Sequence, residues 1–325
     1  MAGQTQYSLQ LNNRFAFSVP EYGFKGMVRL AEMADESPFD IIAIGDSLFD
    51  SPRFEPIATL GALAARTKRI KLAAAIIQPQ FRNPILLALS WATIDIASEG
   101  RSILALGIGG GTPDGVGAEC REVGITRADR GRVLEKTIEE IRALWAGTHE
   151  RVVLPVRPVR GTAPIWIASG IYQPGESKFS AQSGNIQGEG ARWLPGALER
   201  VARLGDGWIT LMATAEELRA AVHKLDENTN RLGRKPVTKA VDFWIHVGDN
   251  RQESLERCRA AITLYFNGAP ISDDTLERWS IAGPPELCRE RIAEFAAVGI
   301  DHIGLLIADR EPFRQFDAIV NKVIG

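Results

Sequence analysis

The chain has 325 residues, of which 45% are hydrophobic and 24% are charged, a balance typical of a globular protein with a large core. Its formal net charge of −2 gives no reason to expect a nucleic-acid or membrane surface, and no apolar run approaches the ~18 residues that span a bilayer. The first residues have neither a basic start nor an apolar core, so we expect no signal peptide. Three scattered cysteines indicate reduced thiols in the cytoplasm, and neither they nor the four histidines have metal-binding spacing.

Short apolar runs alternate with amphipathic stretches along the whole chain, which predicts strands that alternate with helices. We expect strands at 15–19, 39–44, 69–76, 103–106, 164–168, 207–211, 240–247 and 302–307. We expect helices at 24–36, 54–66, 85–98, 128–145, 197–204, 214–232, 251–266, 284–298 and 312–323. This alternation predicts a (β/α)8 TIM barrel that forms one domain over residues 1–325; an open doubly wound sheet is the alternative.

Three stretches are expected to be irregular. Residues 109–126 are predicted to form a loop that leads into the helix 128–145. Residues 171–195 are rich in Gly, Ser and Gln and form an insertion after the fifth strand, on the presumed active-site side. Residues 267–282 form a second excursion. Loops this long in a compact domain are usually functional or mobile.

The apolar run 103–106 ends in four glycines within five positions. Glycine main chain can approach a bound group closely, and the carboxyl ends of parallel strands are where α/β folds place ligands. The stretch lacks the spacing of a dinucleotide fingerprint, because Thr112 stands where the third glycine would be, and no P-loop lysine follows. We interpret it as a cup for an anionic or planar ligand; a tight turn is the alternative. The glycines are Gly107, Gly109, Gly110 and Gly111.

Several polar side chains follow other strands at the same edge. Asp46 and Ser47 follow the second strand, where Asp46 would contact a ligand or cap the next turn. Ser169 and Gly170 follow the fifth strand and offer a hydroxyl and two N–H groups to an anion. His246 ends the seventh strand and is the histidine placed to act as an acid or base.

Beyond the glycine loop, Arg130 lies near a helix start, where it would meet a phosphate or form part of a solvated basic turn.

A set of short motifs, in order across nearly the whole chain, resembles the bacterial luciferase-like family of flavin-dependent oxidoreductases. Each motif is weak alone, but their order and spacing together are specific. They are GDSLF at 45–49, PRFEP at 52–56, LAARTKRIKL at 63–72, NP at 83–84, SEGRSILALGIG at 98–109, PIWI at 164–167, DGW at 206–208 and GPPE at 283–286.

The resemblance implies a TIM barrel that binds FMN, or the deazaflavin F420, at the carboxyl ends of the strands. It implies a non-proline cis peptide at the end of the third strand, within residues 73–75, whose small side chains would let it press behind the tricyclic ring. The cofactor's phosphate would meet the loop from Gly109, Arg130 and Ser169. The resemblance also implies a homodimer that packs the helices 54–66 and 85–98. The expected cofactor contacts are Ala74, Ala75, Gly107, Gly109, Gly110, Arg130, Ser169 and Gly170.

Two departures from the family pattern stand out. Many members have histidine directly after the aspartate of the second strand, whereas this chain has Ser47. The insertion after Ser169 replaces a short Gly-Gly turn, so the phosphate cup is expected to differ.

These features predict a luciferase-like monooxygenase that acts on a small organic substrate with reduced FMN and O₂, served by a separate flavin reductase. Its expected catalytic residues are Asp46, Ser47 and His246. An F420-dependent hydride-transfer enzyme and a non-catalytic flavin-binding relative are the alternatives. A sugar-phosphate barrel enzyme would require Lys or Glu at strand ends, and none stands out.

Overall fold

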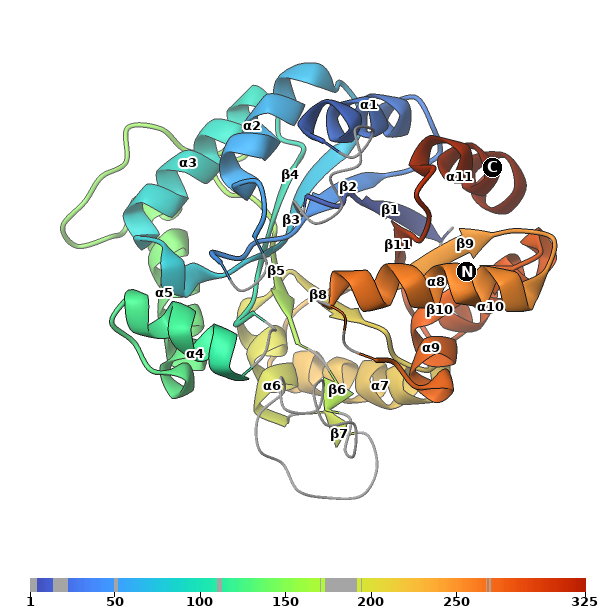
Figure 1. The fold of residues 1–325 in the computed structure, drawn as a ribbon. Coiled ribbons are helices and arrows are strands. Elements are labelled where there is room, and N and C mark those ends of the chain that lie inside the picture. The colour runs from blue at the N-terminus through green and yellow to red at the C-terminus, as the bar shows by residue number, and fades with distance from the viewer. Residues whose placement is uncertain are drawn as a thin grey trace.

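A computed structural model describes residues 5–13, 23–49, 52–109, 113–169, 171–172, 192–193, 195–266, 268 and 270–325. Eight parallel strands close into a ring with helices around it (Figure 1). The strands pair in the order β1, β2, β3, β4, β5, β8, β9 and β11, and β11 pairs with β1 again. The predicted TIM barrel is confirmed, and the open sheet is excluded. The bounds are β1 (Gln6–Gln10), β2 (Ile41–Ile44), β3 (Lys71–Ile77), β4 (Ser102–Leu106), β5 (Ile165–Ala168), β8 (Gly207–Leu211), β9 (Thr238–Val247) and β11 (His302–Ile307).

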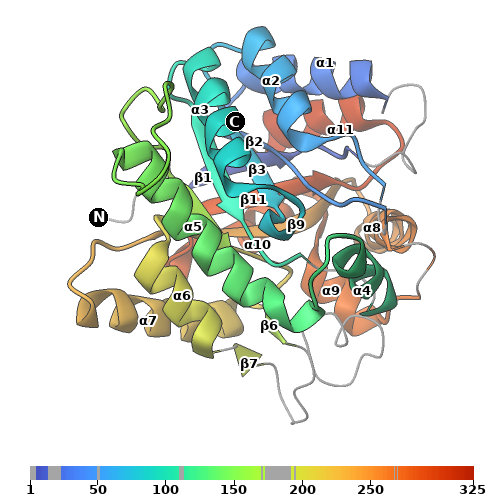
Figure 2. The same ribbon diagram turned by 90° about the vertical axis from the view of Figure 1, so that its left-hand side faces the viewer.

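The helices cover the outside of the ring, and Figure 2 shows α3, α5, α6 and α7 in succession around it. Each turns an apolar stripe toward the strands, as Leu134, Ile138 and Ile141 do in α5. The bounds are α1 (Phe24–Asp35), α2 (Pro56–Arg66), α3 (Pro84–Ala97), α5 (Arg130–Ala146), α6 (Pro195–Leu204), α7 (Ala215–Arg231), α8 (Arg251–Tyr265), α10 (Pro285–Ala297) and α11 (Pro312–Ile319), with short turns η3 (Pro79–Phe81), η4 (Arg127–Asp129) and η6 (Val320–Ile324).

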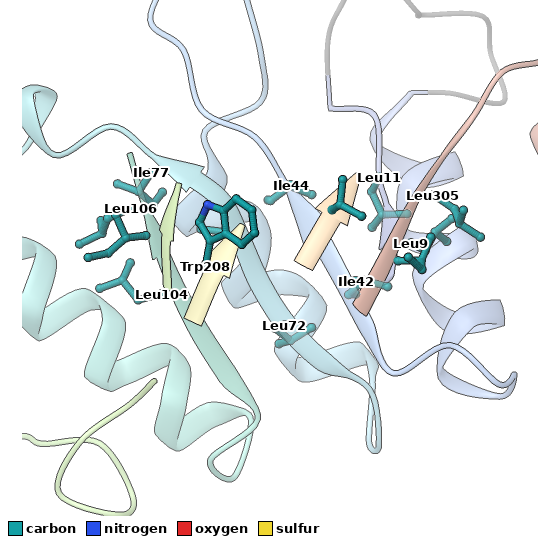
Figure 3. Close-up of a cluster of buried hydrophobic side chains, with 14 of the residues drawn as sticks. Leu9, Leu11, Ile42, Ile44, Leu72, Ile77, Leu104, Leu106, Trp208 and Leu305 are labelled. Carbon is teal, nitrogen blue, oxygen red and sulfur yellow. The ribbon is translucent and has the colours of Figure 1, made fainter. Parts of the chain in front are cut away.

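Two apolar layers follow from the alternation of side chains along each strand. The larger layer lies between strands and helices, where Ile42, Leu72 and Leu104 are fully buried (Figure 3). The smaller layer fills the inside of the barrel, and four of its eight buried residues are alanine. The inner layer consists of Ile41, Ala43, Ala73, Ile103, Ala105, Trp166, Ile209 and Ala240.

Four stretches differ from the sequence-based expectation. The first barrel strand is β1, and the expected strand 15–19 lies outside the described residues. Because β1 directs Ser8 and Gln10 away from the helix-facing core, it lacks a continuous apolar run.

The stretch 109–126, expected to be a loop, contains α4 (Pro113–Glu122). The excursion 267–282 contains α9 (Asp273–Trp279) and most of β10 (Ser280–Gly283), which pairs with β9 outside the closed ring. Within the insertion, β6 (Ile171–Tyr172) and β7 (Arg192–Trp193) form an antiparallel pair.

Candidate active site

The end of β3 departs from regular strand geometry. The peptide bond between Ala75 and Ile76 is cis, one residue beyond the predicted stretch, and the pairing of β3 with β4 shifts register between Ala74 and Ile77. Ala75 and Ile76 pack with the inner layer of the barrel. Ala74 instead belongs to the helix-facing core, so its side chain lies on the outer face of the strand. Ala75 and Ile76 are therefore the residues of β3 that face a ligand in the barrel.

Gly107 lies at the carboxyl end of β4 between the neighbouring strands. A Cβ at this position would lie 2.4 Å from Cδ1 of Ile76 and 2.9 Å from Cβ of Ala168. Such distances are too short for real carbon atoms, so glycine is required for β3, β4 and β5 to approach one another here. We call this closely packed surface at the carboxyl ends of β3, β4 and β5 the floor.

Gly109 continues this floor toward a buried cation. Its φ of +76° is a conformation that favours glycine, and a Cβ would overlap the side chain of Gln78. The guanidinium of Arg130 donates hydrogen bonds to the carbonyls of Ile108 (2.8 Å) and Gly109 (3.1 Å). Arg130 is buried, and burial, followed by the nearby charge of Arg127, lowers its pKa.

No carboxylate in the described ranges forms an ion pair with Arg130, so an anion at the glycine loop would supply the missing countercharge. Gly110 and Gly170, which were predicted to join this site, lie outside the described residues.

Ser169 lies at the end of β5 and is held in place by Trp208. Its hydroxyl oxygen accepts a hydrogen bond from Nε1 of Trp208 (2.8 Å), and its N–H donates to the carbonyl of Ile209 (3.1 Å). The hydroxyl proton is not used in that bond, so the side chain is oriented and can still donate to an anion.

Asp46 is buried and fully engaged. Its carboxylate pairs with Arg82 through both oxygens and accepts the N–H of Gln78 (2.9 Å). Burial would lower the pKa of Arg82, but hydrogen bonds and charges from Asp46 and Glu55 outweigh it and raise the pKa. Asp46 thus fixes the segment that follows β3 and is held as a paired carboxylate.

Ser47 and the two residues after it are bound by Glu119 of α4, which the sequence analysis did not single out. One carboxylate oxygen of Glu119 accepts the hydroxyl of Ser47 (3.1 Å) and the N–H groups of Leu48 (2.9 Å) and Phe49 (2.8 Å). Glu119 is 1% exposed, whereas Leu48 and Phe49 are partly exposed. A buried carboxylate therefore anchors an apolar loop at the mouth.

Replacing Glu119 with glutamine is expected to loosen this loop. The neutral amide forms weaker hydrogen bonds than the carboxylate, and about 1–2 kcal/mol of the free energy of unfolding should be lost. Limited chymotrypsin digestion should cut faster after Leu48 or Phe49. The exposed Glu122 on the same helix provides the control E122Q, which should be cut at the rate of the unmodified protein. Equal rates for both variants would contradict the anchoring role.

His246 is at the end of β9, within a buried polar network. Its Nδ1 lies 3.0 Å from Oγ of Ser254, and its Nε2 lies 2.9 Å from Oδ2 of Asp309 and 3.1 Å from Nε2 of Gln315. Asp309 is partly desolvated, but the hydrogen bond from His246 lowers its pKa overall. The network connects β9 with α8, α11 and the segment after β11, and both ring nitrogens already have partners.

Asp242 is the group at the site that sequence reasoning missed. It lies on β9 and accepts a hydrogen bond from Nε2 of Gln10 (2.9 Å). A Cβ on Gly304 of the neighbouring strand would lie 1.8 Å from its Oδ1, so glycine makes room for the carboxyl group. Burial raises the pKa of Asp242 to about 7, although its side chain retains accessible surface. The sequence did contain a sign of this group, because Asp242 is a charged residue within the otherwise largely apolar strand AVDFWIHV.

The described residues contain no group of three His, Cys, Asp or Glu side chains arranged to hold a metal ion. None of the described helices is long and apolar enough to cross a membrane.

Known proteins share this architecture and sequence pattern. An F420-dependent glucose-6-phosphate dehydrogenase of Nocardia farcinica is 24% identical to this chain. The alignment is 325 positions long and covers 89% of this chain and 90% of that protein. Monooxygenase RslO1 from Streptomyces bottropensis superimposes with a TM-score of 0.77 at 20% identity over 98% of both chains. The oxygenating constituent of 3,6-diketocamphane monooxygenase from Pseudomonas putida, solved with FMN, gives a TM-score of 0.74 at 16% identity over 99% of this chain and 98% of that one.

The sequence model of one family matches residues 7–173 and 190–302, which include the ring strands β2 to β9 in full, all of β1 but its first residue, and only the first residue of β11. That family is described as luciferase-like monooxygenase. The chain therefore belongs to the luciferase-like monooxygenase family.

Proposed function

We propose that the protein is an oxidoreductase that binds FMN with its ring on the floor at Gly107 and its phosphate near Arg130 and Ser169, and that it oxygenates a small organic substrate. The observation that carries this proposal is the floor itself. A Cβ at Gly107 would collide with both neighbouring strands, so glycine lets the carboxyl ends of β3, β4 and β5 pack closely beneath the place proposed for the ring. The buried Arg130 supplies positive charge at the edge of that floor.

The residues present fit this group. Half of the buried residues in the inner layer are alanine, and Gly109 and Arg130 bring main chain and a cation to one corner. When bound, reduced FMN supplies electrons to O₂, whereas F420 transfers a hydride. A separate flavin reductase would deliver reduced FMN, and the three buried free cysteines are compatible with work in the reducing cytoplasm.

The protein's own residues divide into positioning groups and one proton carrier. Asp46 is paired with Arg82, Ser47 with Glu119, and His246 with Asp309, so each of these predicted catalytic residues has a structural partner. Asp242 lacks a cationic partner in the described chain, and burial raises its pKa to about 7, which suits a group that gains and loses a proton near neutral pH. We infer that Asp242 gives or accepts the proton that the reaction moves.

Use of F420 is the second candidate, because several relatives, including the Nocardia farcinica enzyme, are named as F420-dependent dehydrogenases. Turnover assays separate the possibilities. Oxygen consumption that requires FMN, a reductase and NAD(P)H supports the monooxygenase, and anaerobic bleaching of F420 by a substrate supports the dehydrogenase. A protein that binds either cofactor and yet turns over none of a broad alcohol, aldehyde, ketone and sugar-phosphate panel would be the non-catalytic relative.

We also propose that α2 and α3 form a homodimer interface. Leu86 is 63% exposed and Ile96 is 46% exposed, both on the largely apolar helix α3. Replacing Leu86 with glutamate should raise the dissociation constant of the dimer at least a hundredfold, because a charge would be buried in an apolar contact. Sedimentation velocity checks this result. Val153 is 73% exposed and lies outside these helices, so the control V153E should leave the mass of the sedimenting dimer unchanged. A monomeric unmodified protein would contradict the proposal.

A further inference from the structure

Arg53 is a guanidinium at the barrel mouth that has no acidic partner among the described residues. Its Nη1 donates to Oδ1 of Asn13 (2.9 Å), and its Nη2 donates to the hydroxyl of Tyr265 (2.7 Å). Its Nε is buried and has no acceptor. Across the part of the chain that the structure describes, no carboxylate lies within 4.0 Å of Arg53. A guanidinium has five N–H donors, so several of them stay available for a ligand.

The position of Gly45 shows which way this guanidinium faces. Ile41 and Ala43 of β2 belong to the inner layer, and the alternation along the strand places Gly45, which follows, on the same side. A Cβ on Gly45 would lie 3.2 Å from both Cζ and Nη1 of Arg53. The guanidinium therefore lies above the inner face of β2, over the opening of the barrel.

Aromatic rings lie beside the cation. Cζ of Arg53 is 5.5 Å from the ring centroid of Tyr265, the last residue of α8. The ring of Tyr265 meets Trp244 edge-on at 5.2 Å, and Trp244 precedes His246 on β9. Trp244 is fully buried, so Tyr265 is the ring of this pair that lies beside the guanidinium of Arg53.

A desolvated cation is costly unless an anion pairs with it, as Asp46 and Glu55 do for Arg82 nearby. Arginine is also the side chain best suited to bind an oxyanion through two hydrogen bonds. Arg130 contacts the loop after β4, whereas Arg53 contacts residues after β1 and at the end of α8, so the two cations serve different parts of the mouth.

We propose that Arg53 binds a carboxylate, sulfonate or phosphate group of the substrate, with the ring of Tyr265 beside the group that carries it. The substrate class is thus a small organic anion. The inference rests on the proposed function, because it assigns Arg130 to the cofactor and Arg53 to the substrate.

Benzoate tests this subsite, with the neutral benzamide as its control. In thermal unfolding, 50 mM benzoate should raise the melting temperature of the purified protein by about 3 °C, and benzamide should not. R53Q should abolish the shift, and R53K should retain part of it because the charge remains. The exposed Arg310 supplies the matched control R310Q, which should keep the full shift. Because this measurement needs no cofactor, it stands even where FMN and F420 fail to bind.

A second titration separates the substrate from the cofactor as the source of the anion. If Arg53 binds the substrate, R53Q should bind both FMN and riboflavin within twofold of the unmodified protein. A benzoate shift that persists in R53Q, the lack of any benzoate-specific shift, or a selective loss of FMN affinity in R53Q would each overturn the assignment.

Discussion

Gly107→Ala is expected to lower the affinity for FMN or F420 at least tenfold and the free energy of unfolding by about 1–3 kcal/mol. The added Cβ would lie 2.4 Å from Cδ1 of Ile76 and 2.9 Å from Cβ of Ala168. The end of Ile76 can rotate, but the Cβ of Ala168 is fixed to the β5 backbone. The strands must therefore separate, or Ile76 must move into the space assigned to the ring. Urea unfolding and cofactor titration measure the two effects.

Gly196→Ala is the matched control for this substitution. Gly196 is on α6, and no atom lies within 4 Å of a Cβ built there. Alanine favours helix over glycine by about 1 kcal/mol, so this variant should be equally or more stable and should bind the cofactor normally. If Gly107→Ala behaved in the same way, the floor would not be the constrained surface described above.

Asp242→Asn is expected to make the protein more stable at pH 8 by about 2–4 kcal/mol and to change its stability little at pH 4. The ordinary pKa of an aspartate, 3.8, rises to about 7 in the folded protein. Between these values the folded state holds a proton that the unfolded state has lost, so stability decreases as pH rises through this window. Each unit of difference between the folded and unfolded pKa corresponds to about 1.4 kcal/mol of the free energy of unfolding. Because the side chain of Asp242 keeps some contact with water, we expect less than the full difference in stability. Asparagine keeps the shape without the charge.

Urea unfolding at a series of pH values measures this difference between the unmodified protein and the variant. The exposed Asp249, which follows the same strand, provides the control D249N, whose stability should follow that of the unmodified protein at every pH. Activity should also lose its inflection near pH 7 in Asp242→Asn if the carboxyl group moves a proton. A constant difference in stability from pH 4 to pH 8 would contradict the raised pKa.

The barrel was largely predictable because most of its strands are continuous apolar runs, as in Ile41–Ile44 and Ser102–Leu106. The first strand was not, since β1 alternates polar residues toward the barrel interior and reads as QYSLQ. The glycine-rich α4 gave no apolar periodicity, so it was expected to be a loop. Local pattern therefore identified the apolar strands and the amphipathic helices, and missed a strand that alternates polar residues and a helix without an apolar stripe.

At the candidate site, the sequence placed several polar side chains at the ends of the strands but did not indicate the partners of each side chain. The placement of Asp46, Ser47 and His246 follows from the strand ends, but their partners Arg82, Glu119 and Asp309 are brought to them by the fold. Asp242 was missed because it lies within a strand, and its importance depends on Gln10 and Gly304 from other strands. Such contacts are long-range and leave no local pattern.

The central claim is that the barrel mouth binds a tricyclic redox cofactor at Gly107, Gly109 and Arg130. Absorbance titration of the purified protein with FMN and with F420 tests it most directly. The account predicts saturable binding of at least one cofactor in the micromolar range, weakened at least tenfold in Gly107→Ala and unchanged in Gly196→Ala. Failure of both cofactors to bind the folded, unmodified protein would contradict it.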